Sequence, residues 1–126
     1  LVSLARALSQ EPELLLLDEP TSHLDIKHQV KIMNLLQKLN ETLGLTVMMI
    51  IHDLNLASEY CDHLVLMKEG KLFAEGRPEQ VLTYKNVEDV YETIVITQEN
   101  PVSGKPAVML VSANSLTKMK HERSFI

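Results

Sequence analysis

Apolar residues in the first half of the chain follow two different patterns, a helical spacing and short apolar runs. Leu1, Leu4 and Leu8 recur at a spacing that is typical of one helix face. Residues 14–17 are instead an unbroken apolar run, and residues 45–51 are apolar except for Thr46. Short runs without alternation predict strands that are buried on both faces, as in a parallel sheet.

A longer amphipathic segment separates the two apolar runs. Asp25 is a favourable helix-capping residue, and Gly44 is favourable just after a helix end. Between them, one face carries the apolar side chains Ile32, Leu35, Leu36, Leu39 and Leu43. After the second run, Asp53 can cap a further short helix. This strand–helix–strand–helix order predicts an α/β fold in which helices cover a parallel sheet.

The second half of the chain changes to shorter segments separated by turn signals. Glu69-Gly70 lies between two apolar segments and predicts a β-hairpin. Short helical stretches are expected from Arg77-Pro78 and over residues 87–91. A last hairpin is expected to join residues 94–97 with residues 107–111. We therefore expect small C-terminal β-hairpins in addition to the parallel sheet.

The end of the chain has a different character. Residues 113–126 are polar and show no clear periodicity. We expect residues 1–112 to form part of one domain and residues 113–126 to form a polar, disordered tail.

Composition excludes several classes of protein. Of the 126 residues, 45% are hydrophobic and 23% are charged, which is typical of a globular chain and not of a disordered one. No apolar run reaches the roughly 18 residues of a membrane span. The single cysteine, Cys61, excludes an internal disulfide, and no zinc-type Cys/His spacing occurs. A net charge of −5 argues against a nucleic-acid-binding surface.

Acidic residues end the first apolar run. Asp18 and Glu19 follow four leucines, and the carboxyl end of a parallel strand is where α/β sheets bind ligands. An aspartate there can hold Mg²⁺, usually through the water shell of the ion. The adjacent glutamate can polarise an attacking water. The alternative is a strand that merely ends in an acidic turn.

A histidine ends the second apolar run. If the two strands are parallel, His52 lies at the same edge of the sheet as Asp18 and Glu19. A lone histidine at a strand end is often a structural residue, and this alternative stays open. The two nearby carboxylates favour a functional role.

The order of these motifs closely resembles that of the ATP-binding-cassette (ABC) ATPases. The matching segments are residues 14–19 (the Walker B strand with its catalytic glutamate), 22–25 (the D-loop, with His23 in place of the usual alanine), 51–53 (the switch histidine) and 1–10 (the helix that follows the signature sequence). The resemblance covers about residues 1–112 and implies a partial P-loop NTPase-like domain, a parallel sheet with flanking helices.

The resemblance also implies a role for each matching residue. Asp18 would serve the Mg²⁺ of bound ATP, and Glu19 would orient or activate the hydrolytic water. His52 would hydrogen-bond the γ-phosphate and support that water. Ser22 and Asp25 would lie at the interface of an ATPase dimer, where the D-loop couples two nucleotide sites. Asp25 can cap a helix in addition.

The resemblance further implies a setting for the whole protein. Residues 52–57 and 75–82 are similar to importer ATPases for iron-siderophore, haem and cobalamin uptake. Such a subunit forms a homodimer, docks on membrane permease subunits at the cytoplasmic face of the cell membrane, and serves a substrate-binding protein indirectly. No nucleic-acid partner is expected. The alternatives are a soluble, non-transport ABC ATPase and an inactive truncated remnant.

Three motifs of a complete ABC ATPase do not occur in these 126 residues. They are the Gly-rich Walker A loop with its lysine, the glutamine loop and the signature sequence. The chain also opens within a helical pattern, with Leu1 in place of an initiator methionine, so we expect a fragment. Because phosphate cradling needs the missing loop, the isolated chain is predicted to be inactive.

Overall fold

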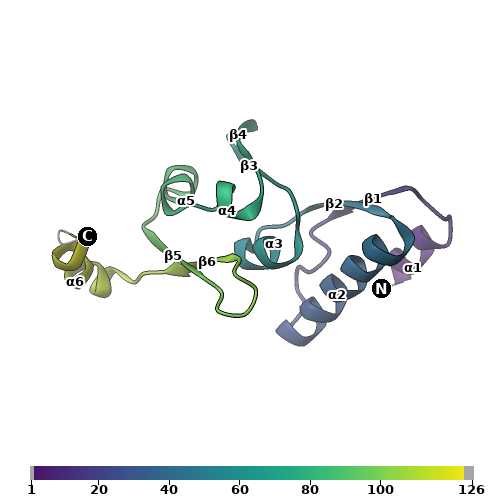
Figure 1. Ribbon diagram of the computed structural model, residues 1–126, viewed down its shortest axis with the longest axis horizontal. Helices are drawn as coiled ribbons and strands as arrows, with labels where there is room; N and C mark the ends of the chain where they lie inside the picture. The colour runs from purple at the N-terminus through teal and green to yellow at the C-terminus, as the bar shows by residue number, and fades with distance from the viewer. Residues whose placement is uncertain (1, 124–126) are drawn as a thin grey trace. The chain divides into compact units, whose positions relative to one another are not determined.

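The computed structural model describes the backbone of residues 2–123 and the side chains of residues 4–118. The chain divides into two compact units, Leu1–Leu56 and Ala57–Ile126. Figure 1 shows the elements of both units, coloured along the chain. No helix among the described residues is both long enough and apolar enough to cross a membrane.

The first unit is built around one strand–helix–strand crossover. Its elements are α1 (Val2–Leu8), β1 (Leu14–Asp18), α2 (Ile26–Leu43), β2 (Thr46–Ile50) and the first residues of α3 (Leu54–Tyr60). β1 and β2 pair in parallel, from Leu14 opposite Thr46 to Asp18 opposite Ile50. Parallel pairing needs a crossover, which α2 supplies. The predicted α/β order is thus confirmed.

Both ends of α2 follow the signals in the sequence. The side chain of Asp25 accepts a hydrogen bond from the backbone N–H of His28, and Gly44 adopts a left-handed φ of 66°. The Gly44 N–H donates to the carbonyl of Asn40 at 3.1 Å. The side chain of Asn40 donates to the carbonyl of Leu45 at 2.8 Å, which directs the chain from the helix into β2.

Only one face of the two parallel strands is covered. Leu15 of β1 is buried, as are Ile32, Met33 and Leu36 of α2. On the opposite face of the strands, four apolar side chains are each at least half exposed: Leu14, Leu16, Met48 and Ile50. The prediction of strands buried on both faces is therefore wrong for the described residues of this unit. Their alternating burial reflects the period of two along a strand, with cover from α2 on one side.

The second unit contains two antiparallel hairpins and short helices. β3 (Leu64–Lys68) pairs with β4 (Lys71–Gly76) through Glu69 and Gly70, both with positive φ, as the sequence predicts. α4 (Pro78–Val81) and α5 (Tyr84–Tyr91) follow. β5 (Val95–Glu99) then pairs with β6 (Pro106–Leu110), close to the predicted positions.

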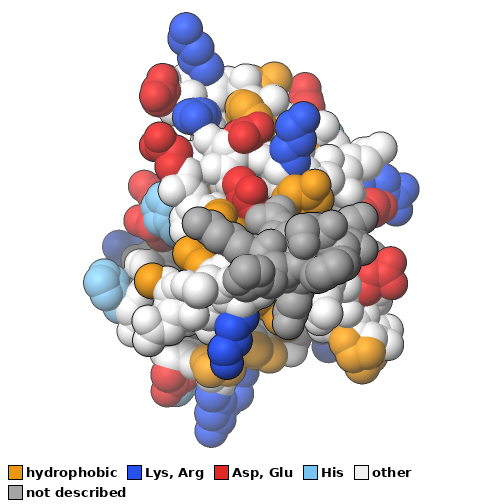
Figure 2. All heavy atoms as spheres, turned by 90° about the vertical axis from the view of Figure 1, so that its left-hand side faces the viewer, with side chains coloured by type: hydrophobic (Ala, Val, Ile, Leu, Met, Phe, Trp, Pro, Cys, Tyr) orange, Lys and Arg blue, Asp and Glu red, His pale blue; other side chains and the backbone are white. Residues whose placement is uncertain are grey.

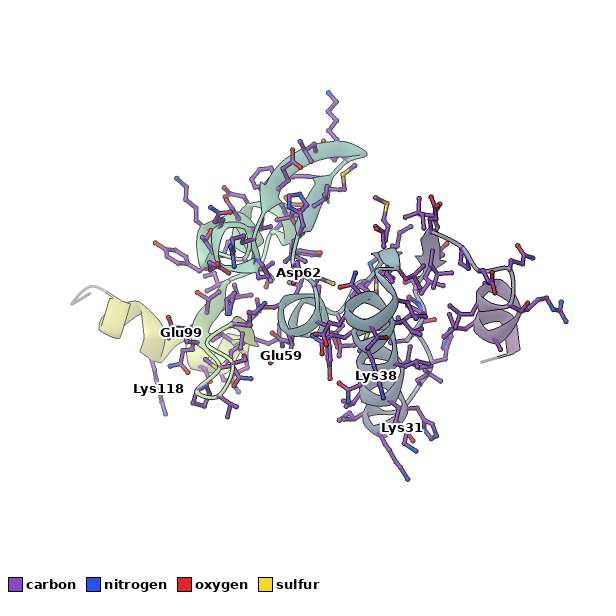
Figure 3. The ribbon with its side chains drawn as sticks, turned by 45° about the vertical axis from the view of Figure 1, so that its right-hand side comes forward. Lys31, Lys38, Glu59, Asp62, Glu99 and Lys118 are labelled. Carbon is purple, nitrogen blue, oxygen red and sulfur yellow. The ribbon has the colours of Figure 1, made fainter. Side chains whose placement is uncertain are left out.

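Polar contacts join these elements within the second unit. The ammonium of Lys68 donates to the carbonyl of Asp89 at 2.6 Å, which ties β3 to α5. The hydroxyl of Ser58, 1% exposed, donates to the carbonyl of Pro106 at 2.5 Å. Glu59, labelled in Figure 3, accepts from the side chain of Asn100 at 3.4 Å. The apolar core of this unit consists of Leu66, Val81, Leu82, Val87, Val95 and Val108.

The polar C-terminal segment is helical where the sequence predicts no element. α6 spans Ala113–Arg123, and the Ser112 hydroxyl accepts a hydrogen bond from the Ser115 N–H at 3.2 Å. A serine cap therefore starts this helix. The segment lacks an apolar stripe, which is why periodicity does not reveal it. Whether a domain ends at residue 112 stays a prediction.

Acidic and basic side chains intermingle over the face that Figure 2 shows.

Candidate active site

The parallel pairing of β1 and β2 brings Glu19 and His52 into contact. Beyond the last strand pair, the Glu19 N–H donates to the carbonyl of Ile50 at 2.9 Å and extends the ladder by one residue. His52 follows Ile50 by two residues, and its Nε2 lies 2.7 Å from Oε1 of Glu19. The side chains are 76% and 40% exposed, respectively. The strand ends thus form an open site that holds a carboxylate and an imidazole together.

The backbone of Glu19 is strained at this point. Its φ is 49°, a left-handed conformation that costs a residue with a Cβ about 1–2 kcal/mol. The following residue is Pro20, which also disfavours helical backbone at the preceding position. Strain of this kind is found preferentially at functional sites. The turn directs the chain out of the strand while the Glu19 side chain stays beside His52.

Asp18 is the last residue of β1 and is exposed. Its carboxylate is the hard oxygen ligand that Mg²⁺ prefers, and Mg²⁺ usually takes one or two carboxylates and completes its shell with water and phosphate. The described residues contain no group of three or more His, Cys, Asp or Glu side chains placed to hold a metal ion. The single exposed carboxylate of Asp18 is compatible with a nucleotide-bound Mg²⁺, because such an ion takes most of its ligands from water and phosphate.

The loop after Glu19 folds back on itself through backbone bonds. The Ser22 N–H donates to the carbonyl of Glu19 at 3.2 Å, and the Leu24 N–H donates to the carbonyl of Thr21 at 3.3 Å. Thr21 is 6% exposed, whereas Ser22 and His23 are exposed. His23 has a φ of 66°. The loop thus has a buried anchor and an exposed tip.

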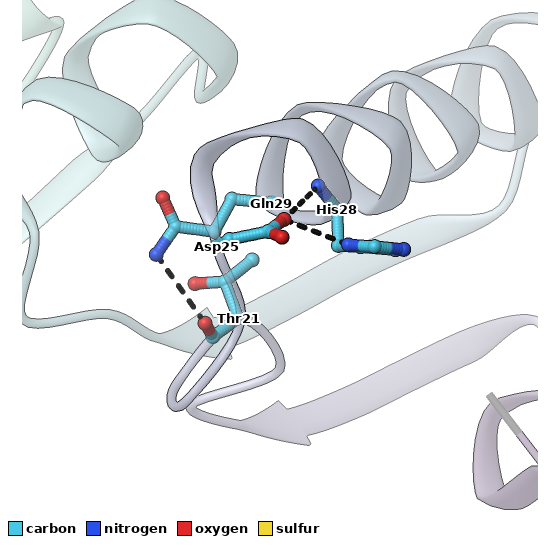
Figure 4. A network of polar contacts seen from close by, with 4 residues as sticks. All are labelled: Thr21, Asp25, His28 and Gln29. Atoms are coloured by element: carbon cyan, nitrogen blue, oxygen red, sulfur yellow. Dashed lines mark hydrogen bonds and ion pairs between the residues drawn. The ribbon is translucent and has the colours of Figure 1, made fainter.

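Asp25 closes this loop as the N-cap of α2 (Figure 4). Its Oδ1 accepts from the His28 N–H at 3.0 Å and lies 2.7 Å from the His28 Nδ1. The hydrogen bond from the backbone of His28, followed by that from its ring, lowers the pKa of Asp25 below the usual value. The helix-cap function predicted for Asp25 is confirmed, and its position at a dimer interface stays a prediction.

Curated relatives are similar to most of the chain. The "Probable siderophore transport system ATP-binding protein" of Bacillus subtilis (strain 168) is 45% identical over 103 residues, which are 82% of this chain and 38% of that protein. The ferric enterobactin transport ATP-binding protein of Escherichia coli (strain K12) is 41% identical and matches 84% of this chain and 39% of its own. The hemin import ATP-binding protein of Hahella chejuensis is 42% identical over 86% of this chain and 45% of its own.

Solved structures agree with these relatives. An inward-facing ABC transporter, described as of the metal-chelate type, superposes with a TM-score of 0.80 at 26% identity over 88% of this chain and 45% of its own. An ATP-binding cassette, solved as a dimer in a post-hydrolysis state with ADP and phosphate, gives a TM-score of 0.57 at 42% identity over 60% of this chain and 32% of its own. By sequence and fold, the chain belongs to the ABC ATPase family.

The chain represents part of an ABC ATPase domain, since it spans about 40% of the length of the curated relatives it matches. No family model matches it. The recognition of the family and of its α/β fold from the sequence is confirmed. The roles of Asp18, Glu19, Ser22, Asp25 and His52 in the ABC ATPase reaction stay predictions.

Two residues close to the ABC ATPase motifs make contacts that the sequence did not predict. His28 and Gln29 both contact the loop that precedes α2. A signal for His28 does exist, because it stands three residues after the capping Asp25, at the position whose N–H a cap satisfies. No pattern in the sequence indicates that Gln29 reaches back to Thr21.

Proposed function

We propose that the chain is the second part of the ATP-binding and ATP-hydrolysing subunit of an ABC importer. The observation that carries this proposal is the 2.7 Å contact between Glu19 and His52 at the adjoining ends of β1 and β2. It joins two side chains, 33 residues apart in the sequence, that the family resemblance assigns to one reaction.

Each side chain has a separate task in this proposal. Asp18 would hold the Mg²⁺ of bound ATP, and the ion would supply neutralisation of the phosphate charge. Glu19 orients the attacking water and accepts its proton. Nε2 of His52 holds the Glu19 carboxylate in the structure. With ATP bound, the same N–H would turn to the terminal phosphate, because a neutral imidazole has a single donor. Ser22 and Asp25 lie across from a second ATPase subunit in a homodimer.

The relatives support a metal chelate as the cargo. Their names refer to siderophore transport, ferric enterobactin transport and hemin import. The dimeric post-hydrolysis cassette supports pairing of two subunits. We infer that the subunit docks on membrane permease subunits at the cytoplasmic face of the membrane. A substrate-binding protein would be an indirect partner, through the permease. The net charge of −5 agrees with partners other than nucleic acid.

The test uses the full-length protein reconstituted with its permease subunits in vesicles. We expect ATP-dependent uptake of a ferric siderophore or of haem. Glu19→Gln should lower ATP turnover by about 10²- to 10⁴-fold, the usual loss of a general base, while ATP binding persists. Asp18→Asn should weaken binding of Mg-ATP. Glu75→Gln, the same chemical change in the second unit, is the matched control and should leave turnover unchanged.

The outcomes separate the candidate functions. ATP turnover without any uptake, and without permease binding, would favour a soluble ABC ATPase. A reading frame that lacks the Walker A loop upstream, together with no turnover, would show an inactive remnant. Uptake that survives Glu19→Gln would contradict the assignment of the catalytic glutamate.

A further inference from the structure

Two neighbouring side chains in the first turn of α2 hold the loop formed by residues 20–25. Figure 4 shows both contacts. The ring of His28 contacts Oδ1 of Asp25 at 2.7 Å, at the end of the loop. The amide of Gln29 donates to the carbonyl of Thr21 at 3.5 Å, near the start of the loop. The loop is therefore attached to one helix at both of its ends.

We propose that His28 and Gln29 are positioning residues for the ATPase reaction. They hold the loop that connects Glu19 with Asp25, and so fix the catalytic carboxylate and the expected dimer contact relative to each other. This inference rests on the proposed function, since it assigns new residues to the same reaction.

The backbone bonds of the loop connect Gln29 to Glu19. The carbonyl of Thr21 accepts from both the Gln29 side chain and the Leu24 N–H. The Ser22 N–H, one residue further, donates to the carbonyl of Glu19. Since Thr21 is buried and Gln29 is half-buried, this path lies partly out of water, where a lost hydrogen bond is felt most. A displacement at Gln29 thus reaches the backbone of Glu19.

The bonds of Asp25 leave part of its carboxylate for another partner. Both His28 contacts end on Oδ1. The Asp25 side chain is 69% exposed, so its second oxygen stays accessible. His28 therefore restricts the Asp25 side chain to one orientation and presents it at the surface, ready to contact a second subunit without a further cost in side-chain entropy.

Two substitutions test the two contacts, and two more serve as rescue variant and control. His28→Leu removes the ring donor but keeps an apolar side chain of similar reach. His28→Asn keeps a donor near the position of Nδ1 and is the rescue variant. Gln29→Glu keeps the shape of the side chain but replaces its donor with a carboxylate. Gln37→Glu makes the same change at an exposed position of the same helix and is the matched control.

The first measurement is independent of ATP turnover. Hydrogen exchange of the Ser22 and Leu24 amides is followed in the full-length protein without nucleotide. We expect exchange about fivefold faster in His28→Leu and Gln29→Glu, the effect of losing one typical hydrogen bond. His28→Asn and Gln37→Glu should match the wild type. Unchanged exchange in both test variants overturns the proposal.

The second measurement is steady-state kinetics of the assembled transporter. We expect kcat for ATP to fall about fivefold to tenfold in the two test variants, with KM unchanged and with recovery in His28→Asn. A purely structural role would lower the melting temperature without changing kcat, and that result overturns the proposal. A wild-type protein without turnover refutes the proposed function instead, and hydrogen exchange still decides whether the two residues position the loop.

Discussion

The contact between Glu19 and His52 predicts strongly coupled effects of substitution. Glu19→Gln keeps the shape and an acceptor oxygen, but it cannot take a proton from water. His52→Ala removes the imidazole whose Nε2 lies 2.7 Å from Oε1 of Glu19. If the two side chains act as one unit on the same water, the double variant should be scarcely worse than the more damaging single variant.

Because the side chains of Glu19 and His52 are exposed, their contact should matter much more for catalysis than for the stability of the fold. With side chains 76% and 40% exposed, the contact contributes about 0–1 kcal/mol to folding, as is usual for exposed ion pairs. Loss of general-base action costs about 10²- to 10⁴-fold in kcat, roughly 3–5 kcal/mol of barrier. A large kinetic effect with a small stability effect is therefore expected from each single variant.

The assay is steady-state ATP turnover of the four proteins of this cycle in the assembled transporter, with denaturant unfolding measured in parallel. The pair His63–Glu75 is a matched control, because its Nε2–Oε2 distance is 3.2 Å and its side chains are 59% and 55% exposed. His63→Ala and Glu75→Gln should change kcat by less than about twofold. A double variant in which the two single losses multiply would refute joint action of Glu19 and His52.

Three further predictions concern the chain itself. Burial raises the pKa of the Cys61 thiol, so alkylation at pH 8 should be slower in the native than in the denatured chain. The free energy of unfolding should also fall as pH rises through the native pKa. Equal alkylation rates in the two states would contradict this prediction. The pKa of Asp25 is lowered from 3.8, mainly by the His28 backbone bond, so its stabilisation is present above about pH 4 and is lost as pH falls through the native value. Asp25→Asn should remove this acid dependence in unfolding curves, and an unchanged acid limb would argue against it. The isolated 126 residues should not turn over Mg-ATP. They should self-associate through the exposed apolar face of β1 and β2, and the double variant Leu16→Lys, Met48→Lys should lower the mass measured by sedimentation. A monomeric wild-type chain would contradict association through that face.

Features that depend on local chemistry could be predicted from the sequence. Asp25 and Gly44 delimit α2 because a side-chain acceptor and a left-handed backbone satisfy the free groups at helix ends. Glu69 and Gly70 form the hairpin turn because both adopt positive φ. The α/β order followed from these signals, and the family resemblance identified the strand ends as the candidate site.

Features that depend on cover from other parts of a protein could not be predicted. A short apolar run indicates that a strand can be buried on both faces, but the face of β1 and β2 opposite α2 is exposed at Leu16 and Met48. The helix α6 lacks an apolar stripe and starts at a serine cap, a signal that is common in loops as well. The contacts of His28 and Gln29 depend on how the loop folds back, which the pattern of apolar positions does not describe.

The contact between Glu19 and His52 is a consequence of strand register. Asp18 lies opposite Ile50, and one further backbone bond from Glu19 to Ile50 places His52 within reach. A shift of β2 by one residue would turn each of its side chains to the other face and would separate the two groups. Asp25 and Gly44 fix where the crossover helix begins and ends, and the Gly44 turn leads the chain into β2 two residues later. The geometry of the proposed hydrolytic pair therefore depends on the pairing of β1 with β2, and a substitution that shifts this pairing should separate Glu19 from His52 even where it touches neither residue.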